Sequence, residues 1–277
     1  MKKSRRGLEL LAIVSDIHAG STVALMPPRF ELSEGQVIEA NALQRFYWQA
    51  WQHMTGWLHE ITGHSPFGLI LNGDLVEGDH HQTDQIISKR LTDHIECAFQ
   101  LLEPIASRAS KVFITQGTEC HTGDTEAALG HRLGAEKGPS GRPVFDRLTL
   151  DVCGKRVVAR HHVGTTSRPW LESNGLGMEL AYEVAQETRD IARNGEPMTD
   201  ILLVAHRHVG GHVVTNEGIC IATPAWQGLT RHGHKVVPAA KCKPGVYVLD
   251  WRGVPDGELP RIHRRIYEAP KPAAIAV

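Results

Sequence analysis

An acid and an imidazole stand two positions apart at Asp16 and His18, and two imidazoles repeat that spacing at His206 and His208. In an extended chain, side chains at positions i and i+2 project to the same side. Each pair can therefore approach one ion from one direction. A buried carboxylate is costly unless its charge is compensated, and a bound cation would compensate it. The alternative is that Asp16 caps a turn and that His18 has no role in binding.

Further nitrogen and oxygen donors follow other apolar runs of the chain. Asp74 ends "LILNGD", Glu119 and His121 lie in "QGTECH", and His161 and His162 follow "RVVAR". Such donors suit Mn, Fe or Zn better than a soft metal. The donors outnumber the ligands of one tetrahedral centre. Two ions that share a bridging carboxylate fit them better, and such a pair of ions serves in-line displacement at phosphorus.

These donors must be positioned by apolar segments of regular structure. Short continuous apolar runs at 8–15, 67–74 and 111–117 are typical of strands that are covered on both faces. Apolar residues at spacings of three and four predict helices over about 41–62 and 85–106. The alternation predicts parallel strands with right-handed crossovers. In such sheets ligands bind at the carboxyl ends of the strands, which is where the donors stand.

The second half of the sequence predicts hairpins around one more helix and strand. The expected features are turns at 153–155 and 216–218, a helix near 175–194, and strands at 200–208, 245–251 and 261–267. Residues 19–40 are expected to form a long loop. Because no linker-like stretch separates the halves, we expect one α/β domain over residues 1–277, with two facing mixed sheets flanked by helices.

Bulk composition narrows the class of protein. The net charge is −1, so no overall charge points to nucleic acid or membrane. No apolar stretch approaches the length of a membrane span, and no cleavage site follows the basic N-terminus. The five cysteines form no C-x-x-C pair, which predicts reduced thiols in the cytoplasm and disfavours a zinc ribbon. Basic runs at 2–6 and 261–265 are more typical of solvated ends than of binding sites.

The segments "SDIHAG", "NGDLVEG", "QGTECHTG", "RHHVG" and "VAHRH" follow the order of five sequence blocks in a known family. The chain thereby resembles the calcineurin-like metallophosphoesterases over residues 14–208. The stretch "SDIHAGSTVALMPP" is similar to members from phages and prophages. The resemblance implies a four-layer αββα sandwich. A metallo-β-lactamase-type hydrolase is disfavoured, because no H-x-H-x-D-H run occurs.

The resemblance also implies a ligand set for two divalent ions, with Mn expected first and Fe or Zn as alternatives. Asp16, His18 and His208 would bind the first ion, and Asp74 would bridge both. His206 would bind the second ion together with His161, which we favour over His162.

This sequence departs from the family pattern in two blocks. Ala205 stands where the last block usually has glycine. In the third block "TECH" replaces the family's Asn-His, so either Thr118 or Glu119 takes the position of the Asn. We favour Glu119 as a ligand, with His121 as the acid, because that register gives both roles a chemically able group.

The implied reaction is attack of a metal-activated hydroxide on a phosphate ester, with His121 protonating the leaving oxygen. His162, Arg168 and Arg231 are the candidates for holding the substrate. With Glu119 as a third carboxylate ligand, the two ions would keep one net positive charge. That charge favours a monoanionic diester over a dianionic monoester.

Three functions compete on this basis. We favour a phosphodiesterase that acts on nucleic acid or nucleotides. A phosphomonoesterase of the same fold is the second. A non-catalytic metal-binding scaffold or sensor is the third, and the altered third block is the feature that supports it. We expect no membrane partner, and the sequence names no protein partner.

Overall fold

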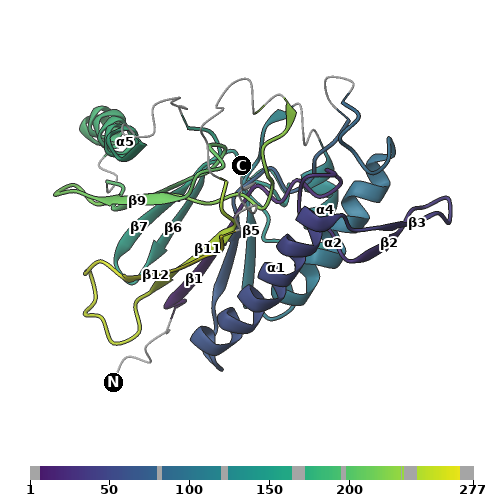
Figure 1. Cartoon of the computed structure of the whole chain (residues 1–277). Helices are drawn as coiled ribbons and strands as arrows, with labels where there is room; N and C mark the ends of the chain where they lie inside the picture. Colours follow the sequence, from purple (N-terminus) through teal and green to yellow (C-terminus); the bar gives the residue numbers. More distant parts are fainter. Residues whose placement is uncertain are drawn as a thin grey trace, which may run out of the picture.

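Two five-stranded sheets face one another in a computed structural model of the chain (Figure 1). The structure describes residues 7–79, 83–119, 124–163, 172–194, 198–231, 233 and 242–268. The first sheet has the strand order β12-β11-β1-β4-β5, and the second has the order β6-β7-β8-β10-β9.

The first sheet contains the three buried strands predicted in the first half of the chain. Its strands are β1 (Leu10–Val14), β4 (Gly68–Leu71), β5 (Lys111–Ile114), β11 (Gly245–Asp250) and β12 (Arg261–Ile266). β1, β4 and β5 are parallel, as predicted, so their carboxyl ends lie at one edge. β11 and β12 extend the sheet in antiparallel fashion.

The second sheet is built largely from the predicted hairpins. Its strands are β6 (Leu148–Val152), β7 (Lys155–Ala159), β8 (Ile201–Val204), β9 (Gly211–Val214) and β10 (Ile219–Ala222). The β6–β7 turn carries positive φ angles at Cys153 (49°) and Gly154 (76°). Positive φ at both central residues matches the twist of a tight hairpin, so the predicted turn is confirmed.

Helices cover both outer faces and complete four layers (Figure 1). They are α1 (Ala42–Thr62), α2 (Leu91–Ala106), α4 (Thr125–Leu133) and α5 (Glu172–Asn194). Along β1, Leu10 and Val14 pack with α1 and α2, whereas Leu11 and Ile13 pack between the sheets. This alternation is the period of two expected of a strand with both faces covered. The predicted fold class, two facing mixed sheets flanked by helices, is confirmed.

Three local predictions differ from the structure. The predicted loop at 19–40 contains a hairpin of β2 (Arg29–Glu31) and β3 (Val37–Glu39), because Phe30 is buried in the core. α2 begins at Leu91, later than predicted, because the preceding segment bonds to the loop after β1: Ile87 N donates to Gly20 O at 2.8 Å. α4 was not predicted.

No helix in the described part of the chain is long and apolar enough to cross a membrane. The cytoplasmic location stays a prediction.

Candidate metal centre

The backbone turns sharply where the strands deliver the predicted donors. Six described residues other than glycine have positive φ, and five of these are candidate ligands. They are Asp16 (49°), His18 (47°), Asp74 (50°), His206 (67°) and His208 (57°). Each such conformation costs of order 1–3 kcal/mol and persists only where the surroundings enforce it, commonly at functional sites. The strand ends are therefore shaped to aim these side chains.

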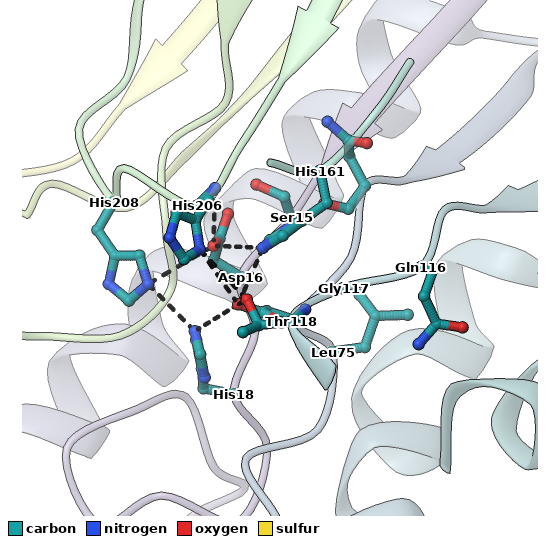
Figure 2. Close-up of polar contacts among 12 residues, drawn as sticks. Ser15, Asp16, His18, Leu75, Gln116, Gly117, Thr118, His161, His206 and His208 are labelled. Carbon is teal, nitrogen blue, oxygen red and sulfur yellow. Dashed lines mark hydrogen bonds and ion pairs between the residues drawn. The ribbon is translucent and has the colours of Figure 1, made fainter. Parts of the chain in front are cut away.

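Asp16, His18 and His208 form the first group, with one ligand atom of each lying within 4.8 Å of the others. Nε2 of His18 lies 3.1 Å from Nε2 of His208, which in turn lies 3.5 Å from Oδ1 of Asp16. Figure 2 shows these side chains converging from the exits of β1 and β8. Asp16 and His18 are fully buried, and the His208 side chain is 21% exposed.

The hydrogen bonding of this group fits a cation. Nδ1 of His18 lies 2.7 Å from Oε2 of the buried Glu77, so Nδ1 carries the proton and the Nε2 lone pair faces His208. Two imidazole nitrogens at 3.1 Å need a proton or a metal ion between them. Oδ2 of Asp16 is buried and has no hydrogen-bond partner among the residues that the structure describes. Burial opposes protonation of His18, but Glu77 outweighs it and raises the His18 pKa to about 8.

Asp74, His161 and His206 form the second group. Nε2 of His161 lies 2.9 Å from Oδ2 of Asp74, and Nδ1 of His206 lies 4.0 Å from the same oxygen. His161 donates from Nδ1 to the Asn72 carbonyl at 2.7 Å, which turns its Nε2 toward the carboxylate. Burial opposes a charge on His161, yet Asp74 and Asp16 raise its pKa to about 10. The site therefore favours a positive charge at this point, which a metal ion would supply.

Asp74 lies between the two groups. Its Oδ2 is 3.8 Å from Nε2 of His18 as well as 2.9 Å from Nε2 of His161. Thr118 fixes this carboxylate: its backbone N donates to Oδ1 at 2.6 Å and its hydroxyl donates to Oδ2 at 3.0 Å. The same hydroxyl lies 3.2 Å from Nδ1 of His206. The Asp74 carboxylate therefore lies within 4.0 Å of histidine nitrogens from both groups.

Two glycines allow the strand ends to approach this closely. A Cβ on Gly73 would lie 2.5 Å from Nδ1 of His161. A Cβ on Gly117 would lie 2.3 Å from the backbone N of Asp74. Both distances are too short for any side chain, so "NGD" and "QGT" need glycine for steric reasons.

Two buried carboxylates support the centre from behind, and the sequence analysis assigned a role to neither. Glu77 accepts from Nε2 of Gln227 at 2.8 Å while it faces His18. Glu126 accepts from the backbone N of Gly117 at 2.8 Å and of Leu75 at 3.1 Å, which ties the exits of β5 and β4 together. Burial raises the Glu126 pKa to about 7. Glu77 stands three positions after Asp74 in the motif "NGDLVEG", so the sequence could have pointed to it. No motif of the sequence pointed to Glu126.

The third block brings Thr118, and not Glu119, beside the ligand groups. Glu119 is exposed, and neither group of ligand atoms includes it. Thr118 lies beside Asp74 instead. The difference arises because the chain leaves β5 with the backbone N and hydroxyl of Thr118 turned inward.

The remaining candidates lie farther out or outside the described residues. His162 is exposed, with its ring centroid 4.9 Å from that of His206. Arg231 forms an ion pair with Asp84 at 2.8 Å, and within the described part of the chain no contact joins it to a candidate ligand. His121 and Arg168 fall outside the described residues.

Solved structures with a related arrangement have low sequence identity. Vps29 from Entamoeba histolytica, solved with Zn²⁺, is 11% identical, with 94% of this chain and 99% of that chain covered at a TM-score of 0.44. An archaeal phosphodiesterase is 10% identical, with 93% and 99% covered at a TM-score of 0.42. A predicted phosphoesterase from Streptococcus pneumoniae is 10% identical, with 93% and 98% covered at a TM-score of 0.33.

No protein-family model and no curated protein matches the sequence. The observed architecture, two facing sheets between layers of helices with the ligand groups at the strand ends, is the one that the resemblance to the calcineurin-like metallophosphoesterases implies.

Proposed function

We propose that this protein is a dinuclear metal-dependent phosphoesterase that hydrolyses phosphodiesters of nucleic acid or nucleotides. The observation that supports it is the Asp74 carboxylate, whose Oδ2 lies within 4.0 Å of nitrogens from both ligand groups. A carboxylate shared between two sets of hard donors is the arrangement of two-metal hydrolytic sites.

In this proposal the ligand residues would be divided between the two ions. Asp16, His18 and His208 would hold one ion, and His161 and His206 would hold the other. When bound, the ions lower the pKa of water and neutralise charge on the phosphoryl oxygens. The N and O donor set suits Mn, with Fe or Zn as alternatives.

Three further residues have roles in the proposal. Thr118 would keep Asp74 in its shared orientation by donating two hydrogen bonds to it. His162, exposed beside His206, would meet the ester from the solvent side. His121 would give a proton to the leaving oxygen.

The charge at the centre does not by itself select a diester. With Glu119 exposed, Asp16 and Asp74 would be the carboxylate ligands among the described residues, so two divalent ions would keep two net positive charges rather than one. The preference for diesters therefore needs support from outside the ligand groups. A basic cavity beside the second sheet gives that support.

Metal analysis combined with a panel of chromogenic monoesters and diesters tests this function. We expect two ions per chain, and turnover of bis(p-nitrophenyl) phosphate that is lost on chelation and restored by Mn²⁺. Faster turnover of p-nitrophenyl phosphate would identify a monoesterase. Two bound ions without turnover of any ester would favour the scaffold or sensor.

A further inference from the structure

A cavity of about 230 Å³ lies where residues of β9, β12 and α5 meet. Arg207, His212 and Arg264 line it, and none of the described residues that line it is acidic. β9 and β12 are the edge strands of the two sheets and lie on the same side of the molecule (Figure 1). The cavity thus combines basic groups from the two sheets.

The cavity suggests a role for one residue of the basic run at 261–265, which lies on β12. Arg261 and His263 approach Oδ2 of Asp250, at 3.7 Å and 3.5 Å, so Asp250 offsets their charge. Successive side chains of a strand point to opposite faces, and Arg264 accordingly faces the cavity. In the register of β11 and β12, Arg264 is opposite Tyr247, and its side chain lies against the Tyr247 hydroxyl. One member of the run is therefore available to a ligand in the cavity.

The cavity is connected along the chain to the candidate metal centre. Arg207 stands between the ligands His206 and His208, and only two residues separate His208 from β9. Gly211, which also lines the cavity, pairs with Ala222, and Ala222 pairs with Val204 at the end of β8, so the cavity lies at the edge of the second sheet that bears the two histidines.

The chemistry of the lining points to a phosphate oxyanion. Arg207 and Arg264 carry permanent charges, and the guanidinium fork matches two phosphate oxygens at once. Burial and the charge of Arg264 lower the pKa of His212, so it adds a neutral donor or acceptor at neutral pH. Leu176 from α5 gives the cavity one apolar wall, against which a sugar or base can pack.

We propose that this cavity binds a second phosphate of the substrate, the one next to the scissile phosphodiester in a nucleic-acid strand. The inference rests on the proposed phosphodiesterase function. It selects a polynucleotide over a cyclic nucleotide, because a second anion site is useful only for a substrate with more than one phosphate.

Arg264→Ala tests the inference, with Arg265→Ala as its matched control. Both arginines are exposed on β12, one residue apart, and they point to opposite faces. The probes are a fluorescein-labelled single-stranded phosphorothioate oligonucleotide for binding by anisotropy, the same oligonucleotide with normal phosphates for kinetics, and bis(p-nitrophenyl) phosphate, which has a single phosphate. Arg264→Lys serves as the charge-retaining variant.

We expect Arg264→Ala to weaken oligonucleotide binding and kcat/KM by about 10- to 100-fold, the value of one charge-assisted hydrogen bond. The slope of the logarithm of the binding constant against the logarithm of the salt concentration should fall by about one released counterion. Hydrolysis of bis(p-nitrophenyl) phosphate should stay unchanged in this variant. Arg264→Lys should recover part of the loss, and Arg265→Ala should match the unsubstituted protein.

Equal losses in Arg264→Ala and Arg265→Ala would overturn the inference, because they would reveal a diffuse basic surface. Equal losses on the oligonucleotide and the small diester in Arg264→Ala would also overturn it. If the unsubstituted protein hydrolyses neither ester, the proposed function fails. The anisotropy measurement still decides whether the cavity binds a nucleic-acid strand.

Discussion

The two ligand groups both lie close to the Asp74 carboxylate but differ in the residues that stand behind them. In the first group a buried carboxylate, Glu77, faces Nδ1 of His18. In the second group a backbone carbonyl, that of Asn72, accepts the corresponding proton of His161. The first group also contains Asp16, whereas Thr118 takes the matching place beside the second.

These differences give the first group more negative charge and less contact with solvent. The His208 side chain is 21% exposed and that of His206 is 33% exposed. A carboxylate behind a histidine raises the basicity of its ligand nitrogen. We therefore expect the first group to hold its ion more tightly and the second to exchange its ion more readily on the substrate side.

Asp74→Ala should have the largest effect, because it removes the carboxylate that both groups share. We expect loss of at least one ion and of nearly all hydrolysis, well beyond the roughly 100-fold that the loss of an outer partner costs. Metal analysis by mass spectrometry and turnover of bis(p-nitrophenyl) phosphate measure the two effects. A variant that keeps both ions would contradict the shared position of Asp74.

His208→Ala and His206→Ala should each empty one group. His208→Ala is expected to remove the tightly held ion and His206→Ala the exchangeable one, because these histidines belong to different groups. Stepwise titration with Mn²⁺, followed by calorimetry, should show one remaining site in each variant, of high affinity only in His206→Ala. If both variants lose the same site, the division into two groups is wrong.

Glu77→Gln and Thr118→Val test whether the two groups have separate supporting residues. Glu77→Gln keeps the shape of the side chain but removes the charge that faces His18, so the first site should weaken by about 10- to 100-fold. Thr118→Val removes the hydroxyl bonded to Asp74 and should weaken the second site more than the first. Weakening of the same site in both variants would show that the two groups have no separate support.

Three of the predicted donors follow directly after apolar runs of the sequence, which is why the sequence placed them at one edge of the sheet. Asp16, His18 and Asp74 leave parallel strands at one edge, and the period of the strands carries that information. The support from Glu126 could not be predicted, since it meets Leu75 across 51 positions and lies on a short helix with a weak apolar pattern. The choice between Thr118 and Glu119 depended on backbone angles after β5, which no periodicity encodes.

Glu119→Asn should have the smallest effect, and it tests the second group directly. If Glu119 were a ligand, its loss would remove one negative charge from that group, loosen its ion and raise the ratio of monoester to diester turnover. Because Glu119 is exposed and belongs to neither group, we expect both metal affinities and that ratio to change by less than about twofold, as for an ordinary surface substitution. The ratio of kcat/KM for p-nitrophenyl phosphate and bis(p-nitrophenyl) phosphate measures this, with metal content as the second readout. A raised ratio with a loosened ion would place a third carboxylate in the centre, and the second group would then match the first in charge.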